Sequence, residues 1–207
     1  MYPKFASLEQ EKKERIINAA IKEFARSGYD RASTNEIIKE ANIAKGSLFS
    51  YFNNKKELYL FLLDYVSEFI DKIYSEVDCD ETDIFEIYRE IALVKFKMYR
   101  KFPQIFDFLK AIAKENAPEV KSELEKRKKE YLVDRGTEKI CRNIDETKFR
   151  SDIDVQKAID IINWTALSFA EQQSNKINSY ADFDVELLRE WERYLDLLRR
   201  CFYKAEE

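Results

Sequence analysis

The sequence predicts an all-α protein, and three observations support this prediction. The 207 residues include only three glycines and three prolines, whereas a β-rich chain needs many more such residues for its turns. Apolar residues recur at spacings of three and four along most of the chain, which is the period of a helix. No run of eighteen apolar residues occurs, so none of these helices is expected to span a membrane.

The first helix is expected to begin near Ser7 or Leu8 and to end at Gly28. Glycine accepts the left-handed conformation that ends many helices, and Tyr29 follows it in position to pack back onto the last turn. The apolar stripe of this helix comprises Ile17, Ala20, Ile21 and Phe24.

Two shorter helices joined by a tight turn are expected next. Ser33 is predicted to cap the first of them, and Glu36 lies three residues further on, which is the spacing of a capping box. This helix is expected to run to about Glu40, and Asn42 suits the turn because asparagine tolerates a positive φ. The second short helix is expected from about Ala44 to Tyr51. This layout is that of a helix-turn-helix, in which the second helix enters the major groove of DNA.

The remaining sequence predicts longer helices, for a total of about nine. The acidic segment from Asp78 to Asp83 is a candidate boundary within this part of the chain. Between Ser151 and Phe202 apolar residues occur on more than one helix face, a pattern typical of helices that pack both in their own core and against a partner subunit. The expected helices are 55–77, 84–98, a short one from Pro103, a charged one from Pro118 to about 140, one capped by Asp152 or Asp154, and 184–203.

Composition excludes several kinds of catalytic site. Histidine is absent, which removes histidine acid–base catalysis and the usual zinc sites that contain histidine. Cys79, Cys141 and Cys201 lie far apart and are odd in number, so we interpret them as reduced, partly buried thiols. No metal and no cofactor is expected. The N-terminal residues lack the apolar core of a signal peptide, which predicts a cytoplasmic protein.

The charge is distributed unevenly along the chain. Residues 1–56 contain eleven Lys or Arg and seven Asp or Glu, a balance of +4, whereas the chain as a whole carries −4 and the remainder therefore −8. A basic N-terminal module on an acidic body suits the binding of a polyanion at one end.

Residues 24–58 closely resemble the DNA-binding domain of the TetR family of bacterial transcriptional regulators. The matched pattern is F…GY…ST..EI…A.IAKGSLFSYF..K.EL, and the resemblance extends over roughly residues 10–60. The chain departs from the family pattern at Phe49, where Tyr is common, and at Asn42, where Gly is common. Phe49 lacks the tyrosine hydroxyl but keeps an apolar face for a thymine methyl group, so no operator sequence is inferred.

The helix-turn-helix contains the candidate DNA-binding residues. The N-terminus of the helix after Ser33 favours an anion, so Ser33 and Thr34 are candidate phosphate ligands, although simple capping would also explain them. Lys45 and Ser47 are candidate base readers, and Gly46 would let the backbone approach DNA closely. The resemblance implies phosphate contacts for Tyr51 and Lys55. The full candidate set is Ser33, Thr34, Lys45, Gly46, Ser47, Phe49, Ser50, Tyr51 and Lys55.

The resemblance implies a helix-turn-helix domain over residues 1–53 and an effector-binding and dimerisation domain over residues 54–207. It implies a homodimeric repressor that uses its last two helices as the dimer interface and leaves a palindromic operator when a small hydrophobic effector binds. The effector-binding residues are not assigned. Aromatic side chains of the second domain could line an effector pocket or could simply form its core: Tyr65, Phe69, Tyr88, Phe96, Tyr99, Phe106, Phe108, Trp164 and Phe169.

Two other functions are consistent with a helical chain of this size. A helical interaction protein could contain a helix-turn-helix that does not read DNA, and an acidic or neutral surface around Lys45 would favour it. The second alternative is a small helical enzyme, but the sequence contains no metal-ligand cluster, phosphate-binding glycine loop or nucleophile motif to support it.

Overall fold

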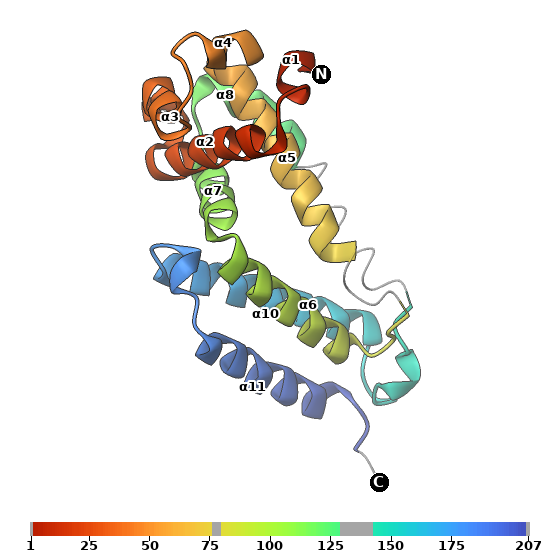
Figure 1. Cartoon of the computed structure of the whole chain (residues 1–207). Helices are drawn as coiled ribbons and strands as arrows, with labels where there is room; N and C mark the ends of the chain where they lie inside the picture. The colour runs from red at the N-terminus through yellow and green to blue at the C-terminus, as the bar shows by residue number, and fades with distance from the viewer. Residues whose placement is uncertain (1, 76–79, 129–142, 206–207) are drawn as a thin grey trace. The chain divides into compact units, whose positions relative to one another are not determined.

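The computed structural model describes residues 2–75, 80–128 and 143–205 (Figure 1). These residues form ten α-helices, two short 3-10 helices and no strand; the nearest feature to a sheet is one isolated bridge between Phe149 and Tyr203. The all-α prediction is therefore confirmed. The helices are α1 Pro3–Ala6, α2 Gln10–Arg31, α3 Thr34–Glu40, α4 Ser47–Tyr51, α5 Lys55–Ser75, α6 Ile84–Lys101, α7 Pro103–Lys114, α8 Pro118–Lys128, α10 Val155–Lys176 and α11 Val185–Phe202, with 3-10 helices at Glu146–Lys148 and Tyr180–Asp182.

Each of the nine expected helices has a counterpart, and the additional one is α1, which is too short to show a periodic pattern. Three predicted features lie outside the described residues: the end at Val77 of the helix that begins at residue 55, the start of the acidic segment at Asp78, and the C-terminal half of the charged helix after Pro118. Cys79 and Cys141 also lie outside them. Cys201 is a free, exposed thiol, so the interpretation of partly buried cysteines is wrong for this one.

The chain forms two compact units. Unit 1 comprises residues 1–70 and 102–131, and unit 2 comprises residues 71–101 and 132–207. The chain passes from unit 1 to unit 2 within α5 and returns between α6 and α7. The predicted functional boundary near residue 53 is a different division, and it stays a prediction.

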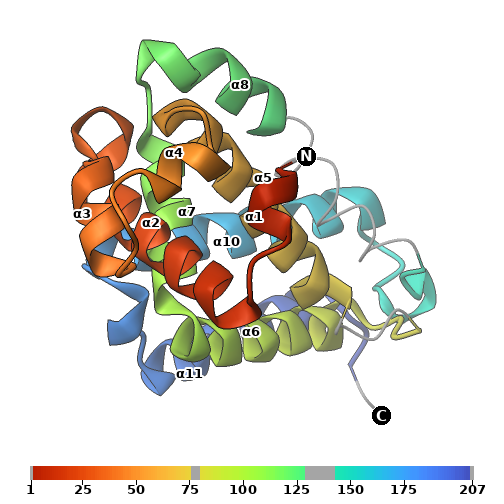
Figure 2. The same cartoon turned by 45° about the horizontal axis from the view of Figure 1, so that its top comes forward.

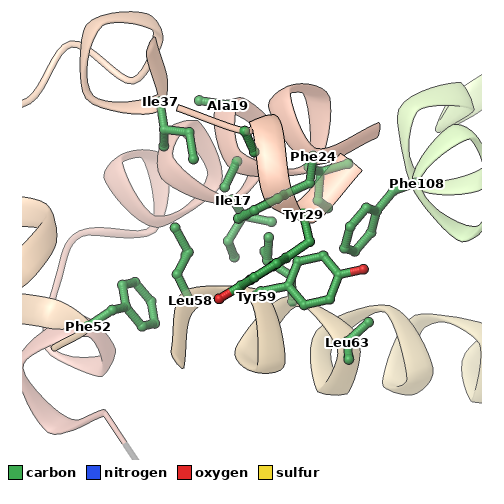
Figure 3. Close-up of a cluster of buried hydrophobic side chains, with 14 of the residues drawn as sticks. Ile17, Ala19, Phe24, Tyr29, Ile37, Phe52, Leu58, Tyr59, Leu63 and Phe108 are labelled. Atoms are coloured by element: carbon green, nitrogen blue, oxygen red, sulfur yellow. The ribbon is translucent and has the colours of Figure 1, made fainter. Parts of the chain in front are cut away.

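The core of unit 1 is an aromatic cluster between α2, α5 and α7 (Figure 3). The ring of Tyr59 lies 4.9 Å from that of Phe24, 5.1 Å from that of Tyr29 and 5.7 Å from that of Phe108, measured between centroids. Burial raises the pKa of both tyrosines, with Glu119 adding to the effect at Tyr29 and Glu115 at Tyr59. Both phenols are therefore neutral, and they pack as large apolar side chains with favourable edge-to-face geometry.

The first long helix is interrupted where the sequence predicts its end. Gly28 has φ 67°, a positive value inside the span assigned to α2, and the ring of Tyr29 stacks on that of Phe24. The predicted break at Gly28 and the packing of Tyr29 are confirmed. The helix begins at Gln10, two or three residues later than expected.

The two short helices follow with two local differences from prediction. The Ser33 hydroxyl accepts from the Glu36 N–H at 3.4 Å, as a cap should, but the Ser33 N–H donates to Glu23 rather than to Glu36. The capping box is therefore only half formed. Asn42 has the expected positive φ of 50°. The helix expected from Ala44 begins at Ser47, and a single turn closed by the Ser47 N–H on the Ala44 carbonyl at 2.8 Å precedes it.

Unit 2 is built from α6, α10 and α11. Asp154, one of the two residues predicted to cap α10, caps it through its side chain. Asp184, near the expected start of the last helix, caps α11 in the same way, although no cap was predicted there. Arg89 on α6 pairs with Glu192 on α11 at 2.9 Å. The buried carboxylate of Asp83 accepts from Lys148 and Arg199; burial alone would raise its pKa, but these cations and the Phe85 N–H outweigh that effect and lower it.

The last two helices have apolar residues on two faces, which confirms that part of the prediction. On the inner face, Trp191 and Leu195 are buried. Large apolar side chains also remain exposed on both helices, including Trp164 at 66 % and Leu167 at 65 % on α10 and Leu197 at 50 % on α11. Large exposed apolar patches of this kind mark interaction surfaces.

We predict that Gly28→Ala lowers the free energy of unfolding, measured by urea denaturation, by about 1–2 kcal/mol, because a side chain at positive φ is strained. The added Cβ would also lie 3.3 Å from the Glu115 carboxylate. Gly46→Ala is the matched control, since Gly46 has φ −83° and nothing within 4 Å of the new Cβ. It should leave stability unchanged or slightly raised, and equal losses in both variants would contradict the prediction.

Candidate nucleic-acid interface

The helix-turn-helix comprises α3, the turn at Ala41 and Asn42, and α4. Its inner side is apolar, since Ile37, Ala41, Leu48 and Phe52 are each at most 1 % exposed. A close crossing of the two helices needs a small residue at Ala41, and the reversal of direction needs the positive φ of Asn42. The pair therefore has one packed side and one free side.

The free side displays the predicted base-reading segment. Lys45, Gly46, Phe49 and Ser50 are exposed, and Ser47 is half-buried at the start of α4. Within the described residues the Lys45 ammonium forms no ion pair, so its charge is available to a ligand. The Ser50 hydroxyl donates back to the Ser47 carbonyl at 2.7 Å and is therefore a weaker candidate than Ser47 for a base contact.

The predicted phosphate ligands differ in how free they are. The Ser33 hydroxyl is used as the cap of α3, whereas the hydroxyl of Thr34, the first residue of that helix, makes no hydrogen bond among the described residues. Tyr51 is half-buried, with its ring 6.2 Å from that of Phe5 and 5.9 Å from the Lys12 ammonium. Thr34 and Tyr51 keep hydroxyl groups that a phosphate oxygen could accept from.

Lys55 is directed into the protein. Its ammonium donates to the carbonyls of Tyr29 at 2.8 Å, Asp30 at 3.1 Å and Ala32 at 3.4 Å, and it lies 4.7 Å from the centre of the Tyr29 ring. An ammonium has three donors. All three donors are used by carbonyls of the turn that leads from α2 to α3. Lys55 therefore stabilises this turn, a role that the family resemblance does not indicate.

Two glutamates that the sequence analysis did not select hold the same turn. Glu23 is 6 % exposed and accepts from the Ser33 N–H at 3.0 Å and the Ser27 hydroxyl at 3.2 Å. Glu115 at the end of α7 accepts from the Tyr29 N–H at 2.6 Å. Glu23 could have been noticed, because it falls at helical spacing on the apolar side of α2, where a charge requires partners.

Four candidate side chains make no hydrogen bond, ion pair or ring contact among the described residues. They lie at the start of α3, in the turn before α4 and on α4, whose packed side is fixed by the core: Thr34, Lys45, Ser47 and Phe49. A model of bacterial regulatory proteins of the tetR family matches residues 16–61, which include most of α2, the helix-turn-helix and the start of α5. Residues 16–61 thus form a DNA-binding domain of the TetR family.

Curated relatives that are named HTH-type transcriptional regulators match parts of the chain. An uncharacterised HTH-type transcriptional regulator, YuxN of Bacillus subtilis, is 40% identical over 68 residues, which is 33% of this chain and 22% of that protein. IcaR of Staphylococcus epidermidis, the HTH-type negative transcriptional regulator of the biofilm operon icaADBC, is 43% identical over 47 residues, 23% of this chain and 25% of that protein. The chain thus spans about a quarter of the length of these two relatives.

Solved TetR structures extend the likeness to the whole fold. A TetR family regulator from Chloroflexus aurantiacus superimposes with a TM-score of 0.63 and 24% identity over 98% of both chains. The regulator FadR of Bacillus subtilis, solved in complex with stearoyl-CoA, has a TM-score of 0.60 and 20% identity over 89% of this chain and 96% of that one. At these identities the likeness concerns the fold.

Among the described residues, no three or more Cys, Asp or Glu side chains converge as they would around a metal ion. Within the same residues, every helix is too short or too polar to cross a bilayer.

We predict that Lys55→Met lowers the free energy of unfolding by about 1–3 kcal/mol, because three carbonyls lose a charged donor. Chemical denaturation measures this loss, and Lys56→Met on the same helix is the control that should be nearly neutral. If Lys55→Met kept full stability but weakened DNA binding, Lys55 would be a phosphate ligand and not a clamp on the turn.

Proposed function

We propose that the protein is a homodimeric transcriptional repressor that binds a palindromic DNA operator and leaves it when a small hydrophobic effector binds. The observation that supports this proposal best is the exposure of Lys45, Gly46 and Phe49 on a helix-turn-helix whose other side is packed. Residues 41–56 contain three lysines and no acidic residue, whereas the interaction-protein alternative would be favoured by an acidic or neutral surface around Lys45. A repressor that binds an operator on the bacterial chromosome would act in the cytoplasm.

In this proposal the free side chains read the operator. Lys45 and Ser47 would contact base edges, Gly46 would allow the backbone close to DNA, and Phe49 would meet a thymine methyl group. Thr34 and Tyr51 would bind phosphates and fix the register of α4 in the major groove. Ser33 and Lys55 would contribute indirectly, because their polar groups are used to shape the turn before α3.

The dimer is proposed to form through α10 and α11. The exposed side chains Ile161, Trp164 and Leu167 lie three residues apart on α10, and Tyr194 and Leu197 have the same spacing on α11. A second copy would cover these stripes and form a four-helix interface around a two-fold axis. Such a dimer would carry two recognition helices, which must lie about 34–36 Å apart to enter successive major grooves.

The effector is proposed to act through residues 54–207. IcaR is named a negative regulator and FadR was solved with stearoyl-CoA. These two proteins therefore favour the hypothesis of a repressor with an acyl-type effector. Within unit 1, Lys55 of α5 and Glu115 of α7 hold the turn that enters the helix-turn-helix. An effector that binds the DNA-free form more tightly must weaken operator binding by the same factor that the operator weakens effector binding.

DNA binding should be directly measurable with the intergenic DNA upstream of the gene. The logarithm of the affinity should fall linearly with the logarithm of the salt concentration. Lys45→Ala and Tyr51→Phe should each weaken binding, the first by about tenfold or more. Fluorescence anisotropy would measure the affinity of the wild type and of each variant. Lys126→Ala on α8 is the charge-matched control. A wild-type protein that does not bind this DNA at low salt would overturn the proposal.

The interface should be disrupted by a charge placed in its apolar stripes. We predict that Trp164→Glu and Leu197→Glu convert the dimer to a monomer in sedimentation experiments and abolish tight operator binding, because a buried unpaired carboxylate is costly. Leu93→Glu is the control, since Leu93 is an exposed apolar residue of α6. A dimer that survives both changes would place the interface elsewhere.

A further inference from the structure

The short helix α1 lies beside α4 and the start of α5 (Figures 1 and 2). Its residue Phe5 is 4 % exposed, with its ring 5.0 Å from that of Phe52 and 5.1 Å from that of Phe61. Phe5 also meets Tyr51 edge-on at 6.2 Å. Tyr51 and Phe52 are the last residue and the C-cap of the recognition helix α4. The one aromatic residue of α1 therefore packs directly on the end of that helix.

Tyr2 extends this contact to the connection between α4 and α5. Its ring lies 4.9 Å from that of Phe52, and its hydroxyl donates to the Glu57 carbonyl at 3.2 Å. The Glu57 carboxylate in turn accepts from the Asn53 side chain at 2.9 Å and from its N–H at 3.3 Å. Tyr2 is thus anchored to the residue that holds the turn between the two helices.

The recognition helix needs such support. It has five residues, no side-chain hydrogen bond at its N-cap, and an N-terminal turn in which Gly46 contributes no side chain. Isolated helices shorter than about 12–15 residues are marginal in water, so α4 depends on packing for its order. Leu48 and Phe52 anchor it to the core, and at its C-terminal end α1 supplies the outer contact.

We propose that Tyr2 and α1, together called the brace, position the recognition helix for DNA binding, with Phe5 as the main positioning residue. This inference rests on the proposed DNA-binding function. The brace would hold the backbone of α4 and the Tyr51 ring in the orientation that DNA requires, without itself contacting a base. Its loss would therefore leave the core of unit 1 folded while α4 becomes mobile.

Hydrogen exchange of the full-length protein without DNA tests the bracing itself. Phe5→Ala should raise amide exchange at least tenfold in residues 47–52 and leave α2 and α7 protected as in the wild type. Phe5→Leu keeps an apolar side chain and should restore most of the protection, which keeps the test usable if Phe5→Ala folds poorly. Lys4→Ala, on the exposed side of α1, is the control. Wild-type protection of residues 47–52 in Phe5→Ala would overturn the proposal.

Binding of the same proteins to the upstream intergenic DNA tests the consequence. Phe5→Ala should weaken binding at least tenfold, Phe5→Leu much less, and Tyr2→Phe should have an intermediate effect because only its hydroxyl contact is lost. Mobile residues 47–52 with unchanged affinity would overturn the positioning role. A wild-type protein without affinity for DNA would defeat the proposed function, whereas the exchange data would still decide whether α1 holds α4.

Discussion

The turn from Gly28 to Ser33 is the constraint on which the rest of unit 1 depends. The helix-turn-helix begins there only because α2 is broken by a residue at positive φ, and the break leaves several backbone groups without helical partners. Side chains satisfy these groups: Glu115 accepts from the Tyr29 N–H, Glu23 accepts from the Ser33 N–H, and Lys55 donates to three carbonyls. Because the partners come from α7, α2 and α5, the turn fixes where α3 starts relative to three longer helices.

This arrangement separates two sets of charged residues with different roles. The charges around the turn are partly or wholly buried and paired with backbone, so they stabilise one conformation. Lys45 faces solvent without an ion pair among the described residues, so its charge remains for a polyanion. Mutations in the first set would therefore change stability, and through it activity, whereas a change at Lys45 would affect binding alone. The two kinds of effect can be confused when activity is the only measurement.

Sequence reasoning succeeded where the determinant is local. The break at Gly28, the positive φ of Asn42 and the cap of Asp154 each follow from one residue and its neighbours along the chain. It did not foresee contacts between residues far apart, such as Lys55 with a turn more than twenty positions away or Glu115 with Tyr29, 86 positions away. The half-formed capping box has the same origin, because Glu23 on another helix took the donor that Glu36 was expected to bind. For the candidate DNA-binding residues the sequence predicted the positions, and the structure distinguished side chains with intramolecular partners from those without.

A recognition helix of five residues also changes how sequence differences in this protein should be interpreted. It packs through Leu48 and Phe52 on the core of unit 1 and against Phe5 beside it, so in the proposed function DNA affinity would depend on residues that do not contact DNA. The free energy spent on ordering a loose α4 would be subtracted from the binding free energy, in the same way as for any segment that becomes ordered on binding. A well-packed α4 avoids that cost. Aromatic residues near the N-terminus would then influence the affinity for an operator as strongly as a base contact does, while leaving its sequence preference unchanged.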